Sequence, residues 1–182
     1  MRFLWIFLTC LLPLGAMAQD MSLLKQPGVV AFMRHALAPG TGDPAAFTLN
    51  DCTTQRNLDD RGRTQARRIG GAMRAEGVSF DAVWTSQWCR CRETAALVDM
   101  GQPMDVPSLN SHFAGRGDRV QQTADTLALI SELPEGERVL LVTHFVNISA
   151  LTGQSAGSGE IIVTRRTAEG GLEGIGQIEI AP

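Results

Sequence analysis

Residues 28–33, Gly-Val-Val-Ala-Phe-Met, form an apolar run of strand length that leads directly into Arg34 and His35. A run without polar alternation is typical of a strand that is buried on both faces of a parallel sheet. A second run of this kind, Arg-Val-Leu-Leu-Val-Thr at residues 138–143, leads directly into His144. The two runs predict two central strands of one sheet, each followed by a histidine.

Helical and extended patterns alternate along the rest of the chain. Apolar residues at helical spacing predict four helices, over residues 58–77, 92–100, 123–133 and 146–151. Further strands are predicted over residues 80–85, 160–165 and 172–180, the last two as a β-hairpin around Glu-Gly-Gly at 169–171. We therefore predict an α/β fold, a three-layer sandwich in which helices flank a mostly parallel central sheet with a C-terminal β-hairpin.

The composition is that of an ordinary globular chain of 182 residues, of which 44% are hydrophobic. The formal net charge is −3, whereas a surface that binds nucleic acid or anionic lipid broadly needs a surplus of Lys and Arg. We therefore expect no nucleic-acid partner, and any bound anion must be held by a few local residues.

The first residues have the pattern of a secretory signal peptide. Arg2 supplies a positive charge, residues 3–12 are almost wholly apolar, and Ala-Met-Ala at 16–18 fits the small-x-small cleavage rule. The apolar run is too short for a bilayer about 30 Å thick, so we expect no stable membrane insertion after processing. We predict a signal peptide at residues 1–18, a single domain at residues 19–182 and a periplasmic or secreted location. An uncleaved signal anchor is the alternative.

Three cysteines remain after such a cleavage, namely Cys52, Cys89 and Cys91. Thiols in an oxidising compartment tend to pair, and Cys89 and Cys91 are too close in sequence for an easy mutual bridge. We predict a disulfide from Cys52 to Cys89 or to Cys91. A zinc site is the competing interpretation, which is disfavoured because the sequence lacks a second Cys-x-x-Cys half, and we expect no metal.

Ligands of α/β sheets bind beyond the carboxyl ends of the strands. The side chains that follow the predicted strands are Arg34 and His35, then Ser86 and Arg90, then His144. One such residue alone is more often structural than catalytic, but here three distant segments bring reactive groups to one edge. We expect the functional site at this edge, with Ser86 and the two arginines binding substrate.

Four segments follow one another in a specific order and spacing: Phe-Met-Arg-His-Ala at 32–36, Leu-x-x-x-Gly-x-x-Gln-Ala at 58–66, Thr-Ser-Gln-Trp-Cys-Arg-Cys-Arg-Glu-Thr-Ala at 85–95 and Val-Thr-His-Phe at 142–145. Together they resemble the histidine phosphatase superfamily, also called the phosphoglycerate mutase-like family. The resemblance implies that His35 is the phosphate-accepting nucleophile and His144 the second histidine of the pocket. It implies that Arg34 and Arg90 bind the phosphate.

The chemistry of these residue types agrees with such roles. A neutral imidazole can attack a phosphoryl group and carry it as a covalent intermediate. Two guanidinium groups bind phosphate oxygens bidentately and offset their charge. A second histidine can donate a hydrogen bond and, when protonated, add positive charge. This arrangement requires neither a metal nor a cofactor.

Two departures from the family pattern bear on the mechanism. Ala36 stands where the family commonly has glycine, and no glutamate stands about twenty residues after Arg90, where the family's acid catalyst is usually found. Asp118 is the better placed candidate for the proton donor, with a helix N-cap as its alternative role, and His112 is a further candidate. Without an acid, good leaving groups such as phosphoramidates or acidic phenols are favoured.

The sequence thus predicts an exported phosphatase that hydrolyses a phosphomonoester, or a phosphoramidate, through a phosphohistidine on His35. Its expected partner is a phosphorylated small molecule, glycan or peptide. One alternative is a phosphate-transferring mutase, which the short chain disfavours. The other is a phosphate- or sugar-phosphate-binding protein that does not turn over its ligand.

Overall fold

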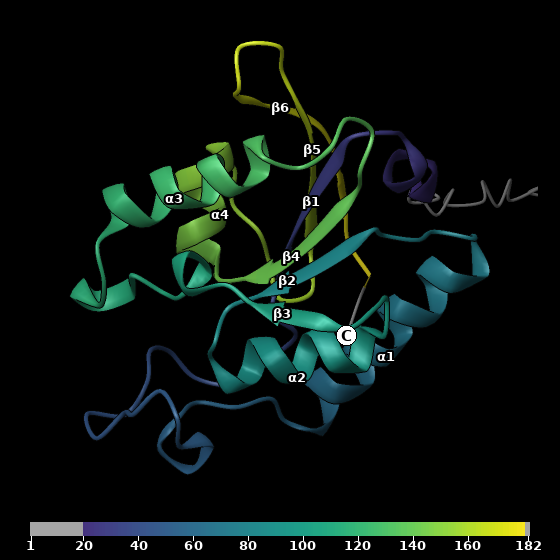
Figure 1. Ribbon diagram of the computed structural model, residues 1–182. Coiled ribbons are helices and arrows are strands. Elements are labelled where there is room, and N and C mark those ends of the chain that lie inside the picture. The colour runs from purple at the N-terminus through teal and green to yellow at the C-terminus, as the bar shows by residue number, and fades with distance from the viewer. Residues whose placement is uncertain (1–19, 181–182) are drawn as a thin grey trace, which may run out of the picture.

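A six-stranded sheet forms the centre of the protein, with helices against both of its faces (Figure 1). The computed structural model describes residues 20–180, so the predicted signal peptide lies outside the described residues. The strands are β1 (Val29–Arg34), β2 (Ala82–Thr85), β3 (Pro103–Asp105), β4 (Val139–Thr143), β5 (Ile161–Arg166) and β6 (Leu172–Ile178).

The order of the strands across the sheet is β3-β2-β4-β1-β5-β6. The strands β3, β2, β4 and β1 are parallel to one another, whereas β5 pairs antiparallel with β1 and with β6. The prediction of a mostly parallel sheet with a C-terminal hairpin is confirmed. The sequence analysis missed β3, because three residues that begin with a proline carry no recognisable strand pattern.

The α-helices of the described residues are α1 (Asp60–Ala75), α2 (Cys89–Val98), α3 (Arg119–Ser131) and α4 (Phe145–Thr152). Short 3₁₀ turns are η1 (Met21–Lys25), η2 (Cys52–Thr54), η3 (Pro107–Leu109) and η4 (Phe113–Gly115). The buried side chains of α1 and α2 share a core with one face of β1 and β4, and those of α3 and α4 cover the other face. Helices α2 and α3 begin before the predicted residues 92 and 123, because their first turns, Cys-Arg-Cys-Arg and Arg-Val-Gln-Gln, lack the apolar spacing that marks a helix.

Helix α1 packs closely against the chain that follows β1. Its N-terminus is capped by Asp59, whose Oδ1 accepts a hydrogen bond of 2.8 Å from the backbone N–H of Gly62. A Cβ on Gly62 would lie 2.0 Å from the carbonyl oxygen of Leu37, so only glycine allows this approach. Gln65 of the same helix accepts a hydrogen bond from the backbone N–H of Leu37. The helix thereby fixes the backbone two residues after His35.

A disulfide joins Cys52 to Cys89, one of the two predicted pairings. It connects the loop between β1 and α1 (residues 35–59, the β1–α1 loop) to the first residue of α2. Cys91 is a free, buried thiol, and burial raises the pKa of this thiol to about 12. Cys91 is therefore protonated at neutral pH.

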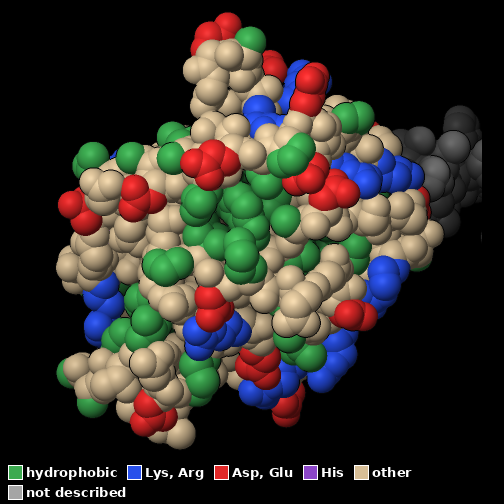
Figure 2. Space-filling view, viewed as in Figure 1, with side chains coloured by type: hydrophobic (Ala, Val, Ile, Leu, Met, Phe, Trp, Pro, Cys, Tyr) green, Lys and Arg blue, Asp and Glu red, His purple; other side chains and the backbone are tan. Residues whose placement is uncertain are grey.

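On the face seen in Figure 2, basic and acidic side chains are interspersed around a central group of hydrophobic ones. Within residues 20–180, no helix combines the length and the apolar character that a membrane-spanning segment requires.

Candidate active site

The two histidines predicted at strand ends lie next to each other. β1 and β4 are adjacent and parallel, with Arg34 opposite Thr143, so the following residues, His35 and His144, emerge at the same edge of the sheet. The backbone N–H of His35 donates to the carbonyl oxygen of Thr143 over 2.9 Å, and the centroids of the two imidazole rings are 5.5 Å apart. Both histidines line a cavity of about 570 Å³.

The imidazole of His35 has one nitrogen fixed and the other free. Its Nδ1 lies 2.8 Å from the carbonyl oxygen of Ala36, and because a carbonyl only accepts, Nδ1 carries the proton. The lone pair is therefore on Nε2. Burial, and then the charge of Arg90, hold the pKa of His35 well below its usual range, so the ring is neutral and its Nε2 is nucleophilic.

His144 is held by hydrogen bonds on both sides of its ring. Its Nδ1 lies 3.5 Å from Nη2 of Arg90, which only donates. Its Nε2 therefore carries the proton and donates to Oγ of Ser86 over 2.9 Å. The hydroxyl of Ser86 lies 3.3 Å from Oδ1 of Asn110, which can accept its proton. Burial, and then Arg90, lower the pKa of His144 well below its usual range.

Two guanidinium groups line the cavity with donors that have no partner. The Nε–H donors of Arg34 and Arg90 are both buried and find no acceptor among the described residues. Arg34 donates only its Nη1, to the carbonyl oxygen of Ala156 over 3.1 Å. Burial, followed by repulsion from Arg90, lowers the pKa of Arg34. An anion bound beside the two guanidinium groups would offset this repulsion.

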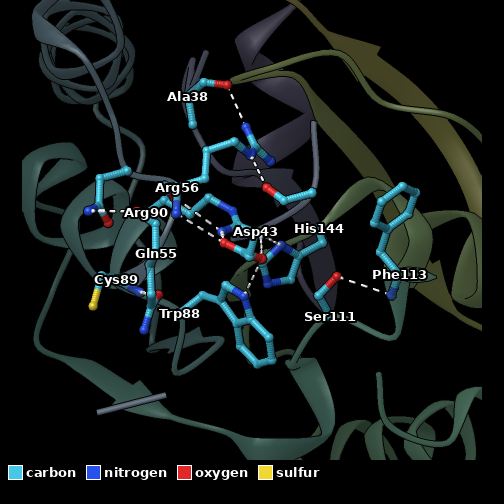
Figure 3. Close-up of polar contacts among 12 residues, drawn as sticks. Ala38, Asp43, Gln55, Arg56, Trp88, Cys89, Arg90, Ser111, Phe113 and His144 are labelled. Atoms are coloured by element: carbon cyan, nitrogen blue, oxygen red, sulfur yellow. Dashed lines mark hydrogen bonds and ion pairs between the residues drawn. The ribbon is translucent and has the colours of Figure 1, made fainter. Parts of the chain in front are cut away.

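Asp43, from the β1–α1 loop, forms a buried ion pair with Arg90 that the sequence analysis did not predict (Figure 3). Oδ1 lies 2.7 Å from Nη1 of Arg90 and Oδ2 lies 3.2 Å from Nη2, and the side chains are 4% and 3% exposed. Oδ2 also accepts from Nε1 of Trp88, and Oδ1 from the backbone N–H of Arg56. Burial alone would raise the pKa of Asp43, but the hydrogen bonds from Arg90 and Trp88 outweigh it and lower this pKa. Asp43 is therefore an ionised carboxylate that orients Arg90.

Arg56 closes the β1–α1 loop around this ion pair. Its Nε donates to the carbonyl oxygen of Gly42 over 2.8 Å, and its Nη1 donates to that of Ala38. Both Arg56 and Asp43 line the cavity. The only signal in the sequence is an acid within Gly-Asp-Pro at 42–44, which also fits an ordinary turn.

Other predicted site residues lie away from the cavity wall. Ser86, expected to bind substrate, is fully buried behind His144 and does not line the cavity. The carboxylate of Asp118 caps α3, where it accepts hydrogen bonds from the backbone N–H groups of Val120 and Gln121. Asp118 thus has its alternative role, that of a helix N-cap. Neither Asp118 nor His112 lines the cavity. Within residues 20–180, no group of three or more acidic, histidine or cysteine side chains could hold a metal ion.

The arrangement defines a class of protein, namely an α/β fold in which two neighbouring histidines and several arginines line one cavity at the carboxyl edge of the parallel strands. Residues 30–110 match the family model of the histidine phosphatase superfamily (branch 1). The fold resembles that of the protein histidine phosphatase SixA complexed with tungstate, with a TM-score of 0.57, 20% identity, and coverage of 82% of this chain and 96% of that one. A putative alpha-ribazole-5'-P phosphatase from Escherichia coli gives a TM-score of 0.63 at 18% identity, over 84% of this chain and 97% of that one.

A curated relative is similar over a shorter stretch. The chain is 48% identical over 42 residues to a 2,3-bisphosphoglycerate-dependent phosphoglycerate mutase from Azorhizobium caulinodans. This stretch is 23% of the chain and only 20% of the mutase. By sequence, residues 30–110 thus match the histidine phosphatase superfamily, and the fold of the chain is that of the solved phosphatases it resembles.

Proposed function

We propose that the protein is a phosphatase that transfers the phosphoryl group of a phosphomonoester, or of a phosphoramidate, first to Nε2 of His35 and then to water. The observation that carries this proposal is one cavity lined by His35, a neutral imidazole with its lone pair on Nε2, and by the guanidinium groups of Arg34 and Arg90. The imidazole supplies the nucleophile, and the guanidinium groups supply the charge that a transferring phosphoryl group needs.

The reaction proceeds in two displacements. In the first, the lone pair of Nε2 of His35 forms a bond to phosphorus, and the bond to the leaving group breaks with its electron pair going to that group, which takes a proton from water. In the second, a water molecule attacks phosphorus and gives a proton to the hydroxide left by the first step, while the N–P bond breaks and returns its electron pair to Nε2 of His35. Arg34 and Arg90 offset the charge on the equatorial oxygens in both steps. Ser86 keeps His144 in one tautomer beside the reacting group.

The leaving group receives little help from an acid in this proposal. Asp43 supplies the carboxylate of the cavity lining, but it accepts four hydrogen bonds from charged or polar donors and has a lowered pKa, so it carries no proton to give at neutral pH. We therefore propose that phosphoramidates and esters of acidic phenols are turned over faster than alkyl phosphates.

We also propose that residues 19–182 form the mature domain and act in the periplasm or outside the cell. The signal-peptide pattern supports this location, as does the disulfide between Cys52 and Cys89, since disulfides persist in oxidising compartments. Intact-mass analysis of exported protein is expected to give a chain that starts at Gln19. Retention of residues 1–18 on exported material would contradict the proposal.

The test of the proposed function is release of p-nitrophenolate from p-nitrophenyl phosphate. The wild-type protein is expected to turn over in the presence of EDTA and to be inhibited by vanadate, which adopts the five-coordinate geometry of the transferring phosphoryl group. His35→Ala is expected to abolish turnover, and His112→Ala, a histidine outside the cavity, is the matched control that retains it.

Three outcomes would overturn the proposal. Full activity of His35→Ala, or activity that is lost in EDTA and restored by zinc, would point to a different mechanism. Binding of phosphate without release of phenolate would favour the phosphate-binding protein. Transfer of the phosphoryl group to a second monoester in preference to water would favour the mutase.

A further inference from the structure

The cavity holds a further arginine, Arg116, whose charge has no acidic partner. Arg116 lines the same cavity as His35, and its guanidinium carbon lies 4.4 Å from the ring centroid of Phe47. None of the ion pairs among residues 20–180 involves Arg116. A guanidinium that rests its flat face on an aromatic ring keeps the N–H donors at its edge free for an anion.

Phe47, whose ring contacts Arg116, is part of the network of side chains that holds Arg90. The ring of Phe47 stacks on that of Trp88, with centroids 4.9 Å apart and an angle of 23° between the planes. Trp88 in turn donates to the carboxylate of Asp43, which binds Arg90. One connected set of side chains therefore positions both guanidinium groups.

The segment that carries Arg116 turns sharply at the cavity. Ala114 has φ 56° and ψ 36°, in the left-handed region that non-glycine residues rarely adopt, and it lines the cavity. On either side of this turn, Phe113 and Arg116 line the cavity. The ring of Phe113 lies 5.8 Å from that of Phe145, which is 38% exposed and directly follows His144. The two rings add an apolar surface to the cavity wall.

The charge of the cavity exceeds what one phosphate needs. Its lining contains four arginines and a single acidic residue, which leaves three positive charges. A phosphate monoester carries about −1.5 to −2 at pH 7. The Nε donors of Arg34 and Arg90 have no acceptor among the described residues. Arg56 donates hydrogen bonds from Nε and Nη1 to backbone carbonyl oxygens. The remaining charge is that of Arg116.

We propose that Arg116 forms a second anion-binding subsite, so that the preferred substrates are phosphomonoesters whose leaving group carries a further anionic group, a carboxylate or a phosphate, next to an apolar part. This inference rests on the proposed function, because it names the class of substrate for the same cavity. The apolar part would lie against Phe113 and Phe145, and the anionic group would reach the free edge of Arg116.

The test uses phosphonates, which cannot be hydrolysed, so that the subsite is measured without turnover. Isothermal titration would compare 4-carboxyphenylphosphonate with its uncharged 4-carbamoyl counterpart. The wild-type protein is expected to bind the carboxylate about tenfold more tightly, the value of one charge-assisted hydrogen bond. Arg116→Gln is expected to reduce this ratio to about one while leaving the affinity for the carbamoyl compound unchanged.

The matched control is Arg119→Gln, which removes the same charge from an exposed residue close in sequence that does not line the cavity. This variant is expected to keep the tenfold ratio. Equal wild-type affinities for the two compounds would overturn the inference, as would an equal loss of both in Arg116→Gln or a similar loss in Arg119→Gln. A tenfold ratio in a protein that fails to hydrolyse p-nitrophenyl phosphate would instead contradict the proposed function, and no binding of either compound would contradict both.

Discussion

The floor and the wall of the cavity are built in different ways. The floor consists of Arg34, His35, Arg90 and His144. Arg34 ends β1, the two histidines follow β1 and β4, and Arg90 belongs to the first turn of α2. The wall consists of residues 40–43 and Arg56 of the β1–α1 loop, together with Ser111, Phe113, Ala114, Arg116 and Phe145. The histidines of the floor are placed by the register of a buried sheet, whereas the wall is held by side-chain bonds such as those of Asp43 and Arg56. We infer that the floor determines the reaction, and the wall determines which substrates reach it.

The two regions meet at the ion pair between Arg90 and Asp43. The guanidinium belongs to the floor and the carboxylate to the wall. Substitutions in the wall are therefore expected to affect the reaction by changing the orientation of Arg90. Substitutions elsewhere in the floor are expected to leave the structure of the wall intact.

The largest effect is expected from a change in the floor that spares the wall. Arg34→Gln is expected to lower kcat/KM by about 10²- to 10³-fold, the cost of losing one preorganised donor to a transferring group. Its thermal stability is expected to change little, because Arg34 is only partly buried and has no acidic partner within hydrogen-bonding reach. Steady-state kinetics and thermal unfolding would be measured together. A loss of activity below threefold, or unfolding of the variant, would remove the distinction between the regions.

A large effect on stability is expected from the wall. The double variant Cys52→Ala/Cys89→Ala opens a loop closed over a sequence separation of 37 residues. Loop entropy predicts a loss of about 4 kcal/mol in the free energy of unfolding. Urea unfolding would measure it, with Cys91→Ala as the control for loss of a thiol outside the disulfide. A loss below about 1 kcal/mol would mean that the remaining contacts of the β1–α1 loop hold the wall without the covalent bond.

The junction between the regions is expected to give a somewhat smaller effect. Asp43→Ala leaves the buried charge of Arg90 without its partner and is expected to cost about 3 kcal/mol. Because the pKa of Asp43 is lowered in the folded protein, its contribution is present at neutral pH and is lost as the pH falls through that lowered value. Unfolding by urea at pH 7 and in acid would measure this, with the exposed Asp125→Ala as the control. An equal cost in both variants would contradict the role of the ion pair.

The smallest effect is expected from the protonation of the floor. The folded pKa values of His35 and His144 are lowered, so below about pH 6.5 the unfolded chain binds protons that the folded protein does not. Stability is therefore expected to fall as the pH decreases below that value, by up to about 1.4 kcal/mol per pH unit for each histidine. Nuclear magnetic resonance titration would check the cause, and both rings are expected to remain neutral at about pH 6. Titration of either ring near its ordinary pKa would contradict this account.

The sequence was a better guide to the floor than to the wall, for physical reasons. His35 and His144 follow apolar runs whose burial in a parallel sheet is visible in their composition, and parallel pairing then brings their side chains together. Asp43 and Arg116 lie in irregular segments without periodicity, and their partners come from distant positions. Nothing local marks Asp43 as the partner of Arg90, which lies 47 residues further along the chain.

Two predicted site residues have hydrogen-bond partners within the protein. Ser86 follows β2 at the expected edge, but it hydrogen-bonds to His144 and lies behind it. Asp118 stands before a helix, and its carboxylate satisfies the backbone N–H groups of the first turn of α3. For both residues, the position in the chain alone does not determine which group the polar side chain binds.

The central claim is that His35 carries the phosphoryl group during turnover. The most direct measurement is a rapid alkaline quench of the protein with excess p-nitrophenyl phosphate, followed by peptide mass spectrometry, because phosphohistidine survives in base. The account predicts a phosphate on the peptide that contains His35, and none on that peptide in His35→Ala. An active protein with no phosphate on His35 under these conditions, or with phosphate on another residue that turns over at the catalytic rate, would contradict it.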